Sequence, residues 1–277
     1  MAERKRIDVL LVEQGLARSR EEAKEWIRSG CVCANGTVAR KAGQPVQDDA
    51  VLTVQAERLP FVSRGGLKLA KALAVFPIRL TGCTALDIGA STGGFTDCML
   101  QAGAHRVYAV DVGSGQLAPS LRQDERVVNL EKTNIRALTS TQIPVPVDFF
   151  CTDVSFISLS LVLPEAARFV KAGGKGVCLI KPQFEVGRGR VGKNGIVRDP
   201  LLHEQSIRAV RDYALRAGFS VQGLDYSPIQ GGSGNIEYLM YLRKTEIPAD
   251  SSQTNVRELV RRAHRAFRGE KQLPEQA

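Results

Sequence analysis

The sequence contains few of the residues that build metal centres or disulfide frameworks. Six cysteines and three histidines occur among 277 residues, and no two cysteines form a C-x-x-C pair. We therefore expect no metal site. No apolar segment follows the charged N-terminus, and the longest apolar run, Val145 to Leu163, is interrupted by Asp148 and Asp153. The sequence indicates neither a secretion signal nor a membrane span, and unpaired cysteines then predict a cytoplasmic protein.

The composition is that of a globular protein with a basic surface. Hydrophobic residues make up 43% of the chain, and the length suits one large and one small domain. The net charge is +9 and the isoelectric point is about 9.4. Such an excess favours a polyanionic partner, although many basic proteins bind no nucleic acid.

Residues 1–59 are predicted to form a small α+β domain. Apolar residues at helical spacing predict helices over Ile7–Gly15 and from Ser19 to Gly30, the second beginning with a capping box. Short strands follow, and Asn35-Gly36 predicts a hairpin between two of them. This pattern resembles the S4 RNA-binding domain.

The resemblance implies that the basic side chains of this region bind RNA. Glutamates lie among them, so a solvated helix face is the alternative, and it is the better one without the S4 pattern. The residues concerned are Arg4, Lys5, Arg6, Arg18, Arg20, Lys24 and Arg28.

Residues 64–245, after a linker at 60–63, alternate between apolar strands and helical segments. That alternation is typical of a parallel sheet covered on both faces, so we expect an α/β domain of the Rossmann-like type with seven strands, the last antiparallel. The predicted strands are Ala85–Ile88, Arg106–Val110, Val127–Leu130, Val147–Cys151, Lys175–Ile180, Ser220–Tyr226 and Glu237–Leu242.

A glycine-rich segment between the first strand and the next helix predicts a cofactor site. The spacing is G-x-x-x-G-G from Gly89, with Asp87 upstream and Asp111 22 residues after Gly89. A dinucleotide loop usually reads G-x-G-x-x-G, and Asp87 would repel a pyrophosphate. An acid there suits the ammonium group of S-adenosylmethionine. The expected cofactor contacts are Asp87, Gly89, Ser91, Thr92, Gly93, Gly94, Phe95, Asp111, Asn134 and Asp153.

Four polar residues are expected to meet at the carboxyl edge of the sheet. Lys68 begins a helix, Asp153 and Lys181 follow the fourth and fifth strands, and Glu237 starts the last strand. Because ligands of open α/β sheets bind at this edge, and an antiparallel strand starts there, topology gathers these residues. Any one of them alone would be an ordinary surface or strand-edge residue.

This set is similar to the Lys-Asp-Lys-Glu tetrad of the FtsJ-type 2′-O-ribose methyltransferases. Together with the S4-like domain, three segments closely resemble the TlyA family: Ser63–Leu69, Lys181–Glu185 and Gly195–Pro200. The resemblance implies methylation of a cytidine ribose in ribosomal RNA or ribosomal subunits. If burial lowers the pKa of Lys181, it could accept or steer the hydroxyl proton, while Lys68 stabilises the alkoxide.

Further basic residues near these motifs are predicted to contact RNA. The loop Gly187–Lys193 could grip phosphate or be merely exposed. In the tail, 246–277, the basic segment Val256 to Phe267 could dock on the body or touch RNA. The family has also been linked to hemolysins, so a membrane-active protein is one alternative, and a non-catalytic RNA-binding or ribosome-assembly factor is another. The additional RNA contacts are Arg64, Arg188, Arg190 and Lys193.

Overall fold

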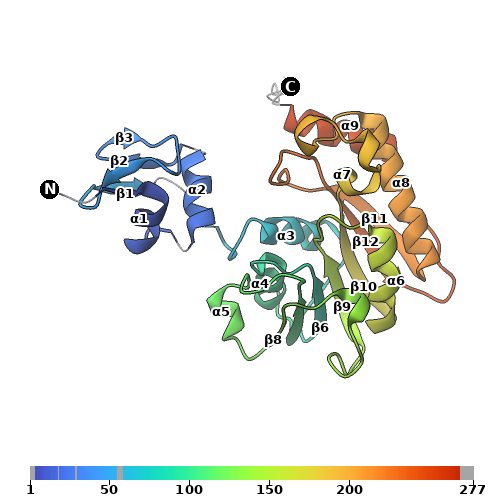
Figure 1. The fold of residues 1–277 in the computed structure, drawn as a ribbon. Coiled ribbons are helices and arrows are strands. Elements are labelled where there is room, and N and C mark those ends of the chain that lie inside the picture. Colours follow the sequence, from blue (N-terminus) through green and yellow to red (C-terminus); the bar gives the residue numbers. More distant parts are fainter. Residues whose placement is uncertain (1–3, 18, 29, 55–58, 269–277) are drawn as a thin grey trace, which may run out of the picture. The chain divides into compact units, whose positions relative to one another are not determined.

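The computed structural model describes residues 4–17, 19–28, 30–54 and 59–268. The chain divides after Pro60 into two compact units (Figure 1). The first has one apolar core, and the second has two, which lie on opposite faces of a central sheet. No helix in the described ranges is both long and apolar enough to cross a membrane.

The first unit packs two helices on short antiparallel strands, as the sequence predicts. Ile7, Leu11, Trp26 and Ile27 lie in its core. The predicted hairpin joins β2 and β3, and Asn35 and Gly36 have φ values of +48° and +76°, as a type I′ turn requires. The elements are β1 (Arg4–Arg6), α1 (Ile7–Glu13), α2 (Arg20–Arg28), β2 (Val32–Ala34), β3 (Thr37–Val38), β4 (Pro45–Gln47) and β5 (Leu52–Val54), paired as β1-β4 and β3-β2-β5.

The second unit contains a seven-stranded sheet, which confirms the predicted fold class. Its order is β11-β12-β10-β9-β6-β7-β8, and β12 runs antiparallel to both of its neighbours. The strands are β6 (Thr84–Ile88), β7 (Arg106–Val110), β8 (Val127–Leu130), β9 (Val147–Thr152), β10 (Val170–Ile180), β11 (Phe219–Tyr226) and β12 (Tyr238–Lys244).

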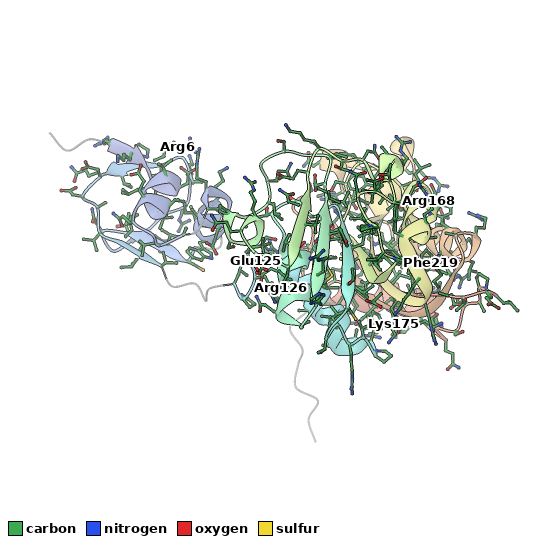
Figure 2. All side chains as sticks on the ribbon, turned by 90° about the horizontal axis from the view of Figure 1, so that it is seen from below. Arg6, Glu125, Arg126, Arg168, Lys175 and Phe219 are labelled. Atoms are coloured by element: carbon green, nitrogen blue, oxygen red, sulfur yellow. The ribbon has the colours of Figure 1, made fainter. Side chains whose placement is uncertain are left out.

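Helices cover both faces of this sheet because successive strand residues point to opposite sides. In β10, Val177 and Leu179 face one core while Cys178 and Ile180 face the other. On the second face Phe219, labelled in Figure 2, packs against Phe150 with ring centroids 5.1 Å apart. The first face carries α3 (Gly65–Val75), α4 (Gly94–Gln101) and α5 (Pro119–Arg122). The second carries α6 (Leu159–Phe169), α8 (Pro200–Arg216) and α9 (Val256–Phe267).

Short helical turns complete the unit: η1 (Ile135–Ala137), α7 (Pro182–Glu185), η2 (Arg188–Arg190) and η3 (Lys193–Gly195). The basic segment of the C-terminal tail is α9, whose Leu259 and Val260 are buried against the body. At the other end, Phe61 packs in the core of the second unit and the Val62 N–H donates to Asp97 at 2.7 Å. Residues 61–63 of the predicted linker therefore pack in this unit.

Candidate active site

The four predicted tetrad residues meet at the carboxyl edge of the sheet. Asp153 directly follows β9, and Lys181 directly follows β10. Glu237 immediately precedes β12, and the pairing of Ile180 with Tyr238 places it beside Lys181. Lys68 reaches the same point from α3. The topology thus brings together residues up to 169 positions apart in the sequence.

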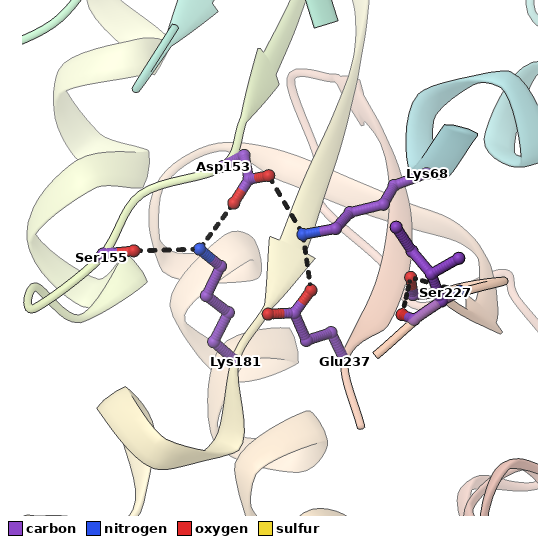
Figure 3. A network of polar contacts seen from close by, with 7 residues as sticks. Lys68, Asp153, Ser155, Lys181, Ser227 and Glu237 are labelled. Carbon is purple, nitrogen blue, oxygen red and sulfur yellow. Dashed lines mark hydrogen bonds and ion pairs between the residues drawn. The ribbon is translucent and has the colours of Figure 1, made fainter. Parts of the chain in front are cut away.

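Asp153 lies between the two lysines, as Figure 3 shows. Its carboxylate is 2.6 Å from Lys181 Nζ and 3.2 Å from Lys68 Nζ. Lys68 Nζ is also 2.7 Å from a carboxylate oxygen of Glu237. The four groups form one chain of alternating charge, Lys181–Asp153–Lys68–Glu237.

This chain of charges is largely removed from water. The side chains of Lys68, Lys181 and Glu237 are 10%, 9% and 3% exposed. Burial alone would raise the pKa of Asp153, but the ammonium groups of Lys68 and Lys181 outweigh it and lower the pKa. For Lys68, burial acts to lower the pKa, but the carboxylates of Asp153 and Glu237 raise it overall. Burial and the charge of Asp153 raise the pKa of Glu237.

Two residues of the loop after Asp153 extend the site, and the sequence analysis missed both. Ser155 Oγ accepts a hydrogen bond from Lys181 Nζ at 3.1 Å. Phe156 has φ +63° and is 93% exposed. Its ring lies 5.2 Å from that of Phe184, whose ring is 5.9 Å from Lys181 Nζ. Phe156 therefore has its backbone in the left-handed region and an exposed ring that contacts Phe184, and this ring is available to a planar ligand group.

Glu185 fastens the loop after β9 to the segment after β10. Its carboxylate accepts hydrogen bonds from Ser158 Oγ at 2.7 Å and from the Leu159 N–H at 2.9 Å, at the start of α6. Burial raises the pKa of Glu185, against these two hydrogen bonds. The clamp fixes the position of Asp153 and Ser155 relative to Lys181.

The glycine-rich loop lies directly beside the tetrad. Gly89 has φ +87°, and a Cβ there would be 2.7 Å from the Asp153 carbonyl oxygen, so only glycine fits. Asp111 holds the loop from the next strand, because its carboxylate accepts from the N–H groups of Ser91 and Gly113 at 2.8 and 2.7 Å. Asn134 lies close by, since the preceding Thr133 N–H donates to the Asp111 carbonyl.

Other predicted cofactor contacts have different surroundings. Asp87 is 0% exposed and accepts hydrogen bonds from Thr96 at 2.6 Å and Cys151 at 3.6 Å. Its contact with the ammonium group of the cofactor stays a prediction, and the structure shows the carboxylate buried and hydrogen-bonded to these two side chains. Phe95 is 3% exposed and packs in the core, whereas Ser91 is exposed and Thr92 is half-buried.

Glycines also set the position of Lys68. A Cβ on Gly94 would lie 2.8 Å from the Gly66 backbone nitrogen, and one on Gly66 would lie 2.3 Å from the Phe61 ring. A Cβ on Gly93 would likewise strike Leu121 at 2.3 Å. Because these residues lack side chains, the starts of α3 and α4 approach closely, which directs Lys68 toward Asp153.

In the first unit, two of the predicted RNA-binding arginines converge on one buried carboxylate. Asp8 is 0% exposed and accepts from Arg6 at 2.9 Å and Arg20 at 3.0 Å. Hydrogen bonds from Arg6, reinforced by Arg20, lower the pKa of Asp8 to about 2. Both arginine side chains remain 52% exposed. They are thus held in place while their outer faces reach solvent.

The remaining predicted RNA contacts vary in environment. Arg4, Arg190 and Lys193 are exposed, whereas Lys5, Lys24 and Arg64 are half-buried. Lys5 forms an ion pair with Glu13 at 2.8 Å, and Arg190 donates to Gln205. Arg18 and the side chains of Arg28 and Arg188 lie outside the described residues.

Family models match both units. The model described as FtsJ-like methyltransferase matches residues 61–244, and the S4 domain model matches residues 5–52. The first includes all four tetrad residues and the glycine-rich loop.

Full-length relatives share both parts. The 16S/23S rRNA (cytidine-2'-O)-methyltransferase TlyA of Mycobacterium tuberculosis is 47% identical over 95% of this chain and 98% of its own length. Hemolysin A of Brachyspira hyodysenteriae is 40% identical over 85% of this chain and 98% of its own. A solved structure from Streptococcus thermophilus, whose name refers to a hemolysin, superposes with a TM-score of 0.79 at 48% identity, covering 97% of this chain and 98% of that one.

Proposed function

Because this chain belongs to the FtsJ-like methyltransferase family and also carries an S4 domain, we propose that it methylates the 2′-hydroxyl of a cytidine ribose in ribosomal RNA. The single observation that carries the proposal is the buried Lys181–Asp153–Lys68–Glu237 chain beside a glycine-rich loop. It offers fixed charges for a hydroxyl that must lose a proton while it attacks. The name of the mycobacterial relative supports the cytidine and the ribosomal RNA.

S-adenosylmethionine is the methyl donor of this family, and the loop residues fit it. Asp111 has both carboxylate oxygens anchored on backbone N–H groups, which leaves it oriented to accept hydrogen bonds from ribose hydroxyls. Gly89 allows a ligand to approach the backbone next to Asp153. When bound, the sulfonium supplies an electrophilic methyl group.

We assign the proton of the 2′-hydroxyl to Nζ of Lys181, which must be the neutral amine at this step so that it can accept the proton as the oxygen bonds to the methyl carbon. Lys68 stabilises the negative charge that develops on the oxygen, since a fixed ammonium in a buried site needs no reorganisation. Asp153 and Glu237 orient the two lysines. With S-adenosylmethionine bound, its carbon–sulfur bond would break as the new bond to oxygen forms. The loop and the tetrad would hold the two reactants in line, so positioning would provide much of the rate enhancement.

The RNA would be held by several surfaces. Arg6 and Arg20 of the first unit present preoriented guanidinium groups, and Arg190 and Lys193 lie in the loop after Lys181. The ring of Phe156 offers a stacking surface for a nucleobase. We place this activity in the cytoplasm, with ribosomal RNA or a ribosomal subunit as the partner.

The test is to incubate the purified protein with ribosomal subunits from a strain lacking it, using S-adenosylmethionine labelled in the methyl group, and to map the label. We expect label on a ribose 2′-oxygen, and none with Lys181→Ala, while that variant still binds the cofactor. A Lys181→Ala variant with full activity would refute the assigned role. If the subunits acquired no label and the protein made liposomes leak, the membrane-active alternative would be favoured. If the protein bound RNA but transferred no methyl group, the non-catalytic assembly factor would be favoured.

A further inference from the structure

Helix α9 carries an unusual excess of positive charge. Residues 256–268 contain five arginines and one acidic residue, Glu258. By contrast, the longer α8 mixes three arginines with Glu204 and Asp212. The apolar side of α9 is buried against the body, so its arginines are displayed on the outside.

Four of these arginines form one row. They are spaced by four, four and three residues, which places them on the same side of a helix. Arg261 forms an ion pair with Glu258 at 2.8 Å. For the others, the structure records no ion pair within the described ranges. We call this row the α9 arginine face: Arg257, Arg261, Arg265 and Arg268.

Two cavities open along this face. The first, of about 380 Å³, is lined by all four arginines together with His264 and Glu204. The second, of about 330 Å³, shares Arg268 and His264 with the first and extends to Arg198, Gly234 and Ile236. The face therefore continues, through the second cavity, to the segment that directly precedes Glu237.

A second set of contacts joins α9, through Tyr226, to the helix that carries Lys68. Lys71, one turn after Lys68 in α3, lies 3.7 Å from the centroid of the Tyr226 ring. The guanidinium of Arg262 lies 5.7 Å from the same ring, and the Phe267 ring is 6.3 Å from it. Tyr226 ends β11 at the sheet edge where Glu237 precedes β12. The C-terminal part of α9 thus lies at the same edge of the sheet as the tetrad.

We propose that the α9 arginine face binds the phosphate backbone of the RNA next to the nucleotide that is methylated. The proposal rests on the proposed function and adds a binding surface that belongs to the catalytic unit itself. Guanidinium groups recognise phosphate through paired hydrogen bonds, and a row of them follows a chain of phosphates. A role in solubility alone would not need the row to border a cavity lined by Gly234 and Ile236, which precede Glu237.

The test compares two triple variants of the full-length protein with equal charge. Arg257, Arg265 and Arg268 are changed to Gln in one, and Arg106, Arg168 and Arg216 in the control. The control residues are exposed and lie at the opposite edge of the sheet, at the start of β7 and the ends of α6 and α8; Arg168 is labelled in Figure 2. RNA affinity is measured against salt concentration, and the steady-state constants of methyl transfer are measured on the same RNA.

We expect the α9 variant to weaken RNA binding about tenfold and to lower the slope of log affinity against log salt by about 2, since each phosphate contact contributes roughly 0.7–0.9. The KM for RNA should rise about tenfold, with kcat and cofactor affinity within about twofold. A triple Arg→Lys variant should keep the wild-type slope because the charge is conserved.

The proposal would be overturned if the α9 Arg→Gln variant had the same salt slope of RNA affinity as the wild type or the control variant. It would also be overturned if the Arg→Lys variant showed the lowered slope. Failure of the proposed function is a separate outcome. If the wild type bound RNA but transferred no methyl group to it, the change in slope would still establish the binding face.

Discussion

Asp8 in the first unit and Asp153 in the second each lie between two basic side chains, yet the two arrangements serve different ends. Asp8 pairs with arginines whose side chains remain 52% exposed. Asp153 pairs with lysines that are about 10% exposed, and a second carboxylate, Glu237, closes the chain. The arrangement around Asp8 holds two guanidinium groups at the solvent-exposed surface. The arrangement around Asp153 buries two ammonium groups away from solvent.

The difference in residue type matches this difference in burial. A guanidinium stays charged at any pH of interest and matches phosphate with a planar fork, whereas a buried ammonium can exchange its proton. The comparison therefore separates a surface for binding a polyanion from a centre that moves a proton. The binding role of the arginines and the proton-transfer role of the lysines can each be tested by single substitutions.

The largest effect is expected from Lys181→Arg, which keeps the positive charge but places a group there that cannot lose its proton. If Lys181 handles the proton, methyl transfer should slow about 10²-fold or more, since proton transfer by a positioned group contributes roughly 10²–10⁴-fold. Lys68→Arg should retain more activity, because charge is what its role requires. Single-turnover rates with saturating RNA and cofactor measure both. Near-normal transfer by Lys181→Arg would make Lys181 an electrostatic residue like Lys68.

A smaller effect, about fivefold on RNA affinity, is expected from Asp8→Asn. This change weakens the anchor of Arg6 and Arg20, so more conformational entropy is lost when they bind phosphate. The matched control is Glu13→Gln, which also removes one negative charge from the first unit and releases Lys5. Net charge alone predicts that both variants bind RNA more tightly, whereas anchoring predicts weaker binding by Asp8→Asn only. Titrations of labelled RNA decide between them, and equal tightening would dismiss the anchoring role.

Low pH should break the same ion pairs of Asp8 with Arg6 and Arg20, because it protonates the carboxylate. The pKa of Asp8 is lowered to about 2 in the folded protein, so its ionised form stabilises the fold above about pH 4. That contribution is lost as the pH falls from about 4 toward 2. Wild type and Asp8→Asn should therefore differ in unfolding midpoint at pH 6 and converge near pH 2. A difference that stays constant with pH would mean that Asp8 stabilises the unit by shape and not by charge.

The sequence predicts the sheet well because buried parallel strands are continuous apolar runs, and six of the seven predicted strands start within one residue of those observed. β10 is the exception, since it begins at Val170, before the glycines that obscure its start. The tetrad could be predicted because strand ends are visible in the apolar pattern. Ser155 and Phe156 could not, because a loop side chain is placed by tertiary contacts such as the Glu185 clamp, which leave no periodic pattern.

Asp87 completes the comparison, because it is a buried aspartate that forms no ion pair with a basic side chain among the described residues. The sequence predicts that this strand-end acid faces the ligand, and the structure shows that its carboxylate accepts hydrogen bonds from Thr96 and Cys151. Burial raises the pKa of Asp87 to about 7, the opposite direction from Asp8 and Asp153. Among these three aspartates the shift differs in sign: the pKa is lowered where a cation lies beside the carboxylate and raised where burial acts without one.

The smallest predicted effect follows from that sign. Because the folded pKa of Asp87 lies above the unfolded value of 3.8, the folded state holds the proton longer, and stability falls as the pH rises from about 4 to about 7. Asp87→Asn removes this dependence while its amide oxygen can still accept from Thr96. Relative to wild type, the variant should gain a few degrees in unfolding midpoint between pH 5 and pH 8, measured by thermal denaturation. If the unfolding midpoint of the variant instead fell relative to the wild type as the pH rose, Asp87 would be ionised in the folded state. That result would require a positive charge close to it, as the predicted contact with the cofactor's ammonium group provides.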